Sequence, residues 1–267
     1  MKIRGLAQAS LDLLEPQIAE NARDETLAVF TTLRYDRRLT ELTRRIPIAM
    51  EDSYNDTFFL ARLHYQRLKY SSQLFQWPEL KYHQFCNALD EAVADFKEST
   101  ARIRVEYNAQ GVLRTVVSPV PQRDNLFSGL SDTPVETESQ DPIFDAVLDT
   151  EQTPTSLFSF IKTNKRAFYD EARARHNIAL GATKEVLLFN EKDEITEGSI
   201  SSVAVLIDGQ WVTPPAEETM NGVLRSFLIN LGFVKEGPIH KSLVKPGVNV
   251  LLFNGVIGVV KGIVKAP

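Results

Sequence analysis

The sequence predicts an α/β protein in two parts, an α+β N-terminal domain followed by a β-rich α/β C-terminal domain. Helical apolar spacing dominates residues 55–98, whereas short alternating apolar runs separated by turn signals recur along residues 185–260. Between the two halves lies an acidic stretch with few residues that could pack. We therefore expect domains at residues 1–120 and 142–267, with residues 121–141 as a loop between them.

The elements expected in the N-terminal half are a helix within 1–25, a strand at 26–35, helices at 55–74 and 79–98, and a hairpin of 101–107 with 112–117. Leu27 and Val29 alternate with polar residues, which favours the strand. Asn55 or Asp56 can cap the first long helix. The four-residue turn of the hairpin ends in Gly111.

Residues 121–141 differ in composition from both flanks. The acidic residues of this stretch are separated mainly by serines and threonines: Asp124, Asp132, Glu136, Glu138 and Asp141. Such a composition offers little apolar surface to bury. We expect a mobile acidic loop or linker.

The elements expected in the C-terminal half are strands at 142–148 and 185–189, a helix at 163–176, a hairpin of 201–207 with 210–213, a helix at 222–231, and strands at 248–253 and 256–260. Asp208 and Gly209 form a two-residue turn signal for the hairpin. Gly232 is placed to end the last helix.

Composition restricts the classes of function. The chain has 267 residues, 43% of them hydrophobic, and a net charge of -5 without a basic block, which disfavours nucleic acid as a partner. Cys86 is the single cysteine, so an internal disulfide and a multi-cysteine zinc site are excluded. No apolar run has membrane-spanning length, and no secretory leader is apparent, so we expect a soluble cytoplasmic protein.

Lys162 and Glu197 are the main candidates for chemistry. Lys162 follows an apolar run and precedes an expected helix, so its amine can be partly desolvated and nucleophilic. Glu197 stands beside Gly198 between two apolar strand patterns. A lysine that forms an imine and a carboxylate that holds a ring-nitrogen proton suit pyridoxal phosphate. The simpler alternatives are a surface lysine at a helix start and a turn carboxylate.

Two further segments could bind an anion. The stretch from Asn221 through Gly222, Val223 and Leu224 opens a helix, where unpaired backbone amides and the helix dipole favour negative charge. Arg67 lies mid-helix and could bind a phosphate through two hydrogen bonds. An ordinary helix cap and a surface arginine remain the alternatives for these two segments.

Taken in order, five motifs resemble the class IV, or fold type IV, family of pyridoxal-phosphate enzymes. The motifs span residues 64–225 and follow the family order: His64-Tyr65-Gln66-Arg67-Leu68, Lys162-Thr163-Asn164-Lys165-Arg166, Ile195-Thr196-Glu197-Gly198-Ser199, Thr213-Pro214-Pro215 and Asn221-Gly222-Val223-Leu224-Arg225. An ordered series of short motifs is specific where any one of them would be weak.

The resemblance implies roles for individual residues. Lys162 would bind the cofactor covalently, and Glu197 would contact the pyridine nitrogen. The phosphate would be held by Arg67 and by the start of the last helix, at Gly222, Val223 and Leu224, and Asn254 would also contact the cofactor. The resemblance further implies a two-domain fold with the cofactor between the domains, and a homodimer.

Within this family, residues 30–34 and Asn254 are similar to the 4-amino-4-deoxychorismate lyases, and residues 33–36 and 169–173 further resemble the fungal type of these proteins. That resemblance implies conversion of 4-amino-4-deoxychorismate to 4-aminobenzoate and pyruvate, a step toward folate. Thr32 is the candidate to position the leaving group, and Thr31 is the alternative. A D-amino-acid or branched-chain aminotransferase, or a non-catalytic homologue, remains open. Ser202 departs from the family pattern, in which asparagine is common at this position.

Overall fold

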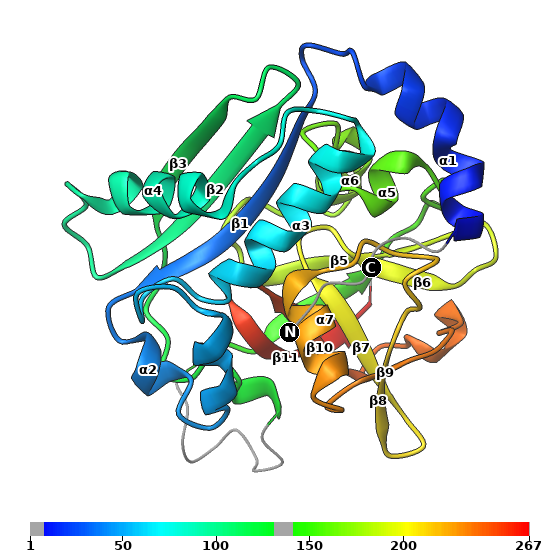
Figure 1. Cartoon of the computed structure of the whole chain (residues 1–267). Helices are drawn as coiled ribbons and strands as arrows, with labels where there is room; N and C mark the ends of the chain where they lie inside the picture. Colours follow the sequence, from blue (N-terminus) through cyan, green and yellow to red (C-terminus); the bar gives the residue numbers. More distant parts are fainter. Residues whose placement is uncertain (1–7, 131–140, 267) are drawn as a thin grey trace. The chain divides into compact units, whose positions relative to one another are not determined.

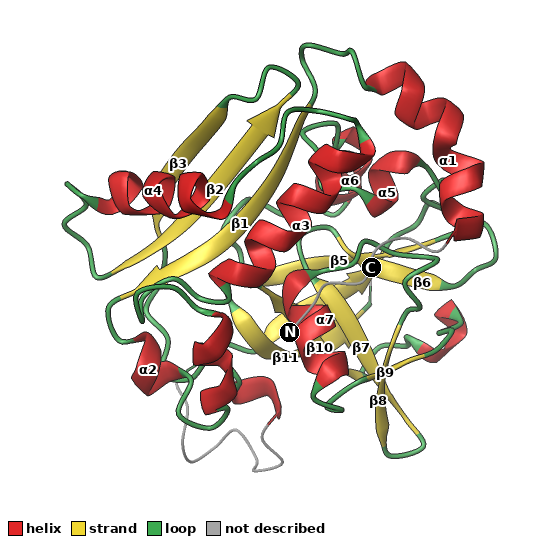
Figure 2. Cartoon of the chain, viewed as in Figure 1, coloured by secondary structure: helices red, strands yellow, loops and turns green. Residues whose placement is uncertain are grey.

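The computed structural model describes residues 8–130 and 141–266, which form two compact units. Unit 1 consists of Met1–Arg123 with Ile161–Lys165, and unit 2 consists of Asp124–Phe160 with Arg166–Pro267. Both units combine helices with a β-sheet (Figure 2), which confirms the predicted α/β class.

Unit 1 is built on a three-stranded antiparallel sheet in the order β1-β2-β3 (Figure 1). The strands are β1 (Ala28–Asp36), β2 (Thr100–Asn108) and β3 (Leu113–Pro119). The last two strands form the hairpin that the sequence predicts, with Tyr107 opposite Leu113. Buried and half-buried residues alternate along β2, as expected for a strand with one face in the core.

The helical elements of unit 1 are α1 (Gln8–Asn21), α2 (Leu39–Leu42), the 3-10 helix η1 (Pro47–Asp52), α3 (Ala61–Leu74) and α4 (Tyr82–Val93). Helix α3 packs against β1, and α4 packs against β3. The buried side chains of α3 include Leu63, His64 and Leu68, so one stripe of this helix faces the sheet.

Unit 2 contains an eight-stranded mixed sheet in the order β6-β5-β4-β11-β10-β7-β8-β9. Its strands are β4 (Phe144–Leu148), β5 (Lys184–Phe189), β6 (Ile195–Gly198), β7 (Ser202–Ile207), β8 (Gln210–Thr213), β9 (Lys235–Glu236), β10 (Asn249–Asn254) and β11 (Gly258–Lys265). The hairpins β7–β8 and β10–β11 lie where the sequence predicts them.

The helical elements of unit 2 are η2 (Ser128–Leu130), α5 (Leu157–Phe160), α6 (Ala167–Arg175), α7 (Val223–Asn230) and η3 (Lys241–Leu243). Helix α6 packs against β5 and α7 against β10. One buried cluster joins the sheet strands, for example through Leu187, Val203 and Leu252. A second cluster joins α6 to β5 through Tyr169, Ala172 and Val186.

Two predicted helices begin later than the sequence suggested. The helix expected from Asn55 starts at Ala61, because Asn55 and Asp56 both have positive φ angles, 50° and 51°, which a helix does not permit. The helix expected over 163–176 starts only at Ala167. Backbone pairing of the preceding residues with β1 is the cause, and it also places Ile161–Lys165 in unit 1 rather than in the predicted domain at 142–267.

The prediction of a solvated loop at 121–141 is wrong for its first part. Leu126 and Phe127 are fully buried, and the amide of Val259 donates to the carbonyl of Leu126 at 2.7 Å. Because acidic and polar residues dominate this stretch, its composition gave no indication that Leu126 and Phe127 are buried. Residues 131–140 lie outside the described part of the chain.

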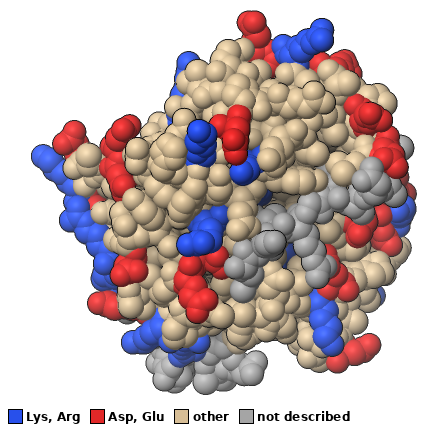
Figure 3. All heavy atoms as spheres, viewed as in Figure 1, with Lys and Arg blue, Asp and Glu red and all other residues tan. Residues whose placement is uncertain are grey.

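The surface carries both signs of charge. On the face shown in Figure 3, Lys and Arg side chains are interspersed with Asp and Glu. None of the described helices combines the length and the apolar composition that a bilayer crossing requires. Over residues 8–130 and 141–266, no three His, Cys, Asp or Glu side chains are grouped as metal ligands.

Candidate active site

Lys162 lies on a short extended segment beside the edge of β1. The amide of Phe30 donates to the carbonyl of Lys162 at 2.8 Å, and the amide of Asn164 donates to the carbonyl of Ala28 at 3.0 Å. Thr163 and Val29 form an antiparallel bridge between these bonds. The lysine is therefore held by strand pairing and not, as the sequence suggested, by the start of a helix.

Side chains next to Lys162 reinforce this pairing. Asn164 accepts a hydrogen bond from the amide of Ala28 and donates one to the carbonyl of Thr26, at 2.9 and 2.7 Å. Lys165 forms an ion pair with Asp24 at 3.0 Å. Hydrogen bonds from Thr26 and Lys165 lower the pKa of Asp24 to about 2. Asn164 and Lys165, which follow Lys162, thus both bind residues at or just before the start of β1.

One face of β1 brings an amine, a hydroxyl and a guanidinium together. The amine of Lys162 lies 5.0 Å from the ring centroid of Phe30, and the guanidinium carbon of Arg104 lies 3.5 Å from the same centroid. Thr32 shares this face because strand side chains alternate, and it stands directly opposite Arg104 in the antiparallel register. Arg104 also pairs with Glu106 at 2.6 Å.

Thr31 points to the opposite face of β1, toward α3. Its hydroxyl lies 2.7 Å from Nδ1 of His64 and accepts a hydrogen bond of 2.7 Å from Nη2 of Arg67. Thr31 is fully buried, whereas Thr32 is half-buried. Of the two threonines, only Thr32 lies on the face of Lys162, which favours Thr32 as the group that meets a substrate.

In unit 2, Glu197 lies near the end of β6 and is 8% exposed. The phenol of Tyr169, on α6, donates a short hydrogen bond to Oε1 of Glu197. Burial raises the pKa of Tyr169 well above its ordinary value, and the Glu197 carboxylate raises it further. The phenol therefore remains a proton donor at neutral pH, and it favours the ionised form of Glu197.

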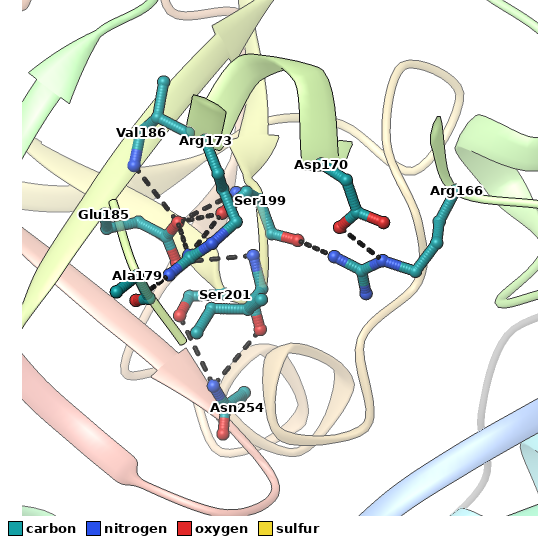
Figure 4. Close-up of polar contacts among 10 residues, drawn as sticks. Arg166, Asp170, Arg173, Ala179, Glu185, Val186, Ser199, Ser201 and Asn254 are labelled. Atoms are coloured by element: carbon teal, nitrogen blue, oxygen red, sulfur yellow. Dashed lines mark hydrogen bonds and ion pairs between the residues drawn. The ribbon is translucent and has the colours of Figure 1, made fainter. Parts of the chain in front are cut away.

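A buried polar cluster supports the turn that follows Glu197 (Figure 4). Oε1 of Glu185 accepts hydrogen bonds from the hydroxyl and the amide of Ser199, at 2.6 and 3.0 Å. Arg173 donates to the Ser199 hydroxyl at 2.9 Å and lies 3.8 Å from Glu185. Glycine is required at Gly198, because a Cβ there would meet the Glu185 side chain at 2.8 Å.

Glu185 and Arg173 are residues that the sequence analysis did not identify as part of a site. Burial raises the pKa of Glu185, while hydrogen bonds from Ser199 and Ser201 and the charge of Arg173 oppose the shift. The available signal was a glutamate at the start of the apolar run that forms β5. A carboxylate in that position needs buried partners.

Asn254, at the end of β10, also forms hydrogen bonds to the turn that follows Glu197. Its side-chain amide donates to the carbonyl of Ile200 at 3.1 Å and to the hydroxyl of Ser201 at 3.4 Å. Its carbonyl oxygen accepts from the amides of Val256 and Ile257 at 2.9 and 3.0 Å. In this structure the Asn254 side chain bonds to the protein at both ends, and its predicted contact with a cofactor stays a prediction.

The start of α7 has the features of an anion site. Gly222 precedes the helix, and no side chain caps this end. The amide of Ser226 makes the first intrahelical bond, to the carbonyl of Gly222 at 2.9 Å, so the amides of Val223 and Leu224 come before the helical hydrogen-bond ladder. A Cβ at position 222 would meet Oγ of Ser202 at 2.6 Å. Ser202 thus fills the space that the absent side chain leaves.

Unit 2 also contains a small pocket next to Glu197, lined by Thr153, Thr155, Ser159, Phe168, Leu188, Thr196, Glu197 and Glu218. Glu197 is the one predicted site residue in this lining.

Comparisons with known proteins identify the family. The class IV amino-transferase family matches residues 49–262. A provisionally named aminodeoxychorismate lyase of Schizosaccharomyces pombe is 31% identical over 221 residues, which cover 79% of this chain and 86% of the relative. The aminodeoxychorismate lyase of Saccharomyces cerevisiae is 34% identical over 139 residues, which cover 46% of this chain and 37% of the relative.

A similar fold occurs in a crystal structure of a provisionally named amino-acid aminotransferase from Mesorhizobium loti. The TM-score is 0.68 at 20% identity, over 89% of this chain and 99% of that one. The likeness in fold agrees with the sequence match over most of the chain. On this evidence, the chain belongs to the class IV aminotransferase family.

Proposed function

We propose that this protein is a pyridoxal-phosphate-dependent lyase that converts 4-amino-4-deoxychorismate to 4-aminobenzoate and pyruvate, a step toward folate. The observation that carries the proposal is the shared face of β1, on which Lys162, Thr32 and Arg104 lie together. The names of the two yeast relatives support the choice of reaction.

The donor set fits the cofactor that the family implies. Lys162 supplies a primary amine beside an aromatic ring, and Glu197 supplies a buried carboxylate that accepts a hydrogen bond from Tyr169. Arg67, and the amides of Val223 and Leu224 at the start of α7, would hold the phosphate. Bound pyridoxal phosphate would supply an electron sink for the carbon from which a proton is removed.

The chain's own residues have separate tasks in this reaction. Lys162, when neutral, removes the proton from the amine-bearing carbon of the substrate. The guanidinium of Arg104 offers a cation for one of the two substrate carboxylates. The hydroxyl of Thr32 orients the enolpyruvyl group, which leaves with a proton as the ring becomes aromatic. A hydroxyl is a weak acid, so Thr32 positions this group rather than protonating it alone.

The test is to incubate the purified protein with pyridoxal phosphate and 4-amino-4-deoxychorismate, without an added amino acid or keto acid. We expect equal amounts of 4-aminobenzoate and pyruvate. A requirement for a keto-acid acceptor would instead indicate an aminotransferase. Failure of the protein to change the cofactor's absorbance would indicate a non-catalytic homologue.

A matched pair of lysine variants sharpens this test. Borohydride reduction followed by mass spectrometry should find the cofactor on Lys162, and Lys162→Ala should abolish both the adduct and the activity. Lys165→Ala is the control, because Lys165 lies three residues away and pairs with Asp24 on the surface. Trapping of the cofactor on another lysine with activity retained would refute the assignment.

We also propose that the protein is a cytoplasmic homodimer. The resemblance to the family supports the dimer, and a single cysteine fits a reducing compartment. Sedimentation of the purified protein, with and without pyridoxal phosphate, tests the oligomeric state.

A further inference from the structure

Thr31, His64 and Arg67 form a buried chain of hydrogen bonds inside unit 1. Thr31 is on β1, and the other two residues are three positions apart on the face of α3 that meets this strand. Thr31 is 0% exposed and His64 is 1% exposed. The two hydrogen bonds that meet at the Thr31 hydroxyl are both 2.7 Å long.

The direction of each hydrogen bond follows from the chemistry of the three groups. A guanidinium can only donate, so the Thr31 oxygen accepts from Arg67. The hydroxyl hydrogen then points to Nδ1 of His64, which acts as acceptor, and the imidazole proton sits on Nε2. In the opposite tautomer, Nδ1 would donate to the Thr31 oxygen, and the Thr31 hydrogen would have no acceptor. Nε2 has no partner in either tautomer, so the opposite tautomer is disfavoured.

The electrostatics of the site agree with a neutral histidine. Burial lowers the pKa of His64 well below its usual value, and the positive charges of Arg67 and Lys162 lower it further. A neutral His64 leaves Arg67 as the cation of this group. The hydroxyl of Thr31 is in turn fixed as an acceptor, with its lone pair directed at Nη2 of Arg67.

This arrangement fixes the guanidinium before any ligand arrives. A long arginine side chain loses rotational freedom when it binds a phosphate, and that loss weakens binding. A buried hydroxyl that already holds Nη2 reduces the loss. We propose that Thr31 and His64 are positioning residues that hold Arg67 in the orientation that binds the cofactor phosphate. The inference rests on the proposed function, because it requires that Arg67 meets that phosphate.

The experiment compares the affinities of two probes, pyridoxal phosphate and pyridoxal, which lacks the phosphate. Thr31→Val keeps the shape and removes the hydroxyl. We expect it to weaken binding of pyridoxal phosphate by roughly 3- to 10-fold, the usual effect of immobilising one flexible side chain, and to leave binding of pyridoxal unchanged. Thr31→Ser, which restores the hydroxyl, should recover most of the affinity.

Thr43→Val is the matched control, because Thr43 is an equally buried threonine of unit 1 whose hydroxyl donates to the carbonyl of Leu39. It should leave both affinities as they are. His64→Leu removes the acceptor of the Thr31 hydrogen and should reproduce the selective loss for pyridoxal phosphate. Equal weakening of both probes by Thr31→Val, or weakening of neither, would overturn the inference.

The failure of the proposed function gives a different pattern. If the parent protein binds neither pyridoxal phosphate nor pyridoxal, the proposed function fails. Inorganic phosphate, followed by its ³¹P signal, then decides the inference. Weaker phosphate binding in Thr31→Val than in the parent supports the role of Thr31, and equal or absent binding in both proteins overturns it.

Discussion

Truncation of Glu185 tests how the turn after Glu197 is held in place. In Glu185→Ala, the hydroxyl of Ser199 and the amide of Val186 lose the acceptor that Glu185 provides, in a region where Glu185 itself is 1% exposed. The amide of Ser199 keeps the carbonyl of Val186, at 3.1 Å, as its acceptor. Each buried donor left unpaired costs about 1–3 kcal/mol. Two such donors, with the cation of Arg173 left beside them, predict a loss of about 2–5 kcal/mol in the free energy of unfolding.

Glu185→Gln separates the hydrogen bonds from the charge. Burial raises the pKa of Glu185, so the fold disfavours its ionised form, and an uncharged side chain of the same shape should cost only about 1 kcal/mol. The raised pKa also determines whether stability rises or falls with pH. The folded protein binds the Glu185 proton more tightly than the unfolded chain does. Stability should therefore fall as the pH rises from about 4.5 through the folded pKa, and Glu185→Gln should remove that fall.

The assay is urea unfolding of the parent and both variants at several pH values, together with amide exchange of residues 199–201. Glu217→Gln, at an exposed position of unit 2, is the control and should lie within about 0.5 kcal/mol of the parent. A Glu185→Ala variant within 1 kcal/mol of the parent, roughly the worth of one ordinary hydrogen bond, would show that the cluster does not support the turn. A Glu185→Gln variant as unstable as the alanine variant would show that charge dominates.

Three further changes have defined outcomes. Glu197→Ala should keep the cofactor bound but lower kcat by roughly 100-fold or more, because the charge that it supports develops after binding; near-normal kcat would refute its assignment as the ring partner. Gly222→Ala places a Cβ 2.6 Å from Oγ of Ser202 and should weaken cofactor affinity by about 1–3 kcal/mol in an equilibrium titration. The added change Ser202→Gly should restore part of that affinity, and no loss in the single variant would argue against a close approach at this helix. Asp24, with a pKa lowered to about 2, stabilises the fold above pH 3.8, and its contribution is lost as the pH falls through about 2. Unfolding measured from pH 5 to pH 2 should show that loss in the parent and not in Asp24→Asn.

Local patterns in the sequence predicted most of the strands. The hairpin turn at Asp208 and Gly209 and the alternation along 101–117 are complete within short windows, and both hairpins are confirmed. The late start of α6 was not predictable in the same way. It depends on pairing of Thr163 with Val29, which are far apart in the sequence.

The residues of the candidate site show the same difference between local patterns and long-range contacts. Lys162 and Glu197 were identified because each stands in a short motif with a chemical meaning. Glu185 and Arg173 were missed because their role appears only when β5, α6 and the turn at Ser199 are brought together. The choice between Thr31 and Thr32 likewise needed the sheet, since it depends on which face of β1 carries Lys162.

The pairing of Ile161–Lys165 with β1 has a consequence for the N-terminal unit as a separate protein. The sheet order leaves β1 at an edge, and Lys162 and Asn164 occupy the backbone groups that this edge would otherwise present to another chain. An unpaired edge strand is a template for aggregation. A fragment that stops at Arg123 would therefore expose the edge of β1. The segment that carries Lys162 thus also covers the edge of this strand.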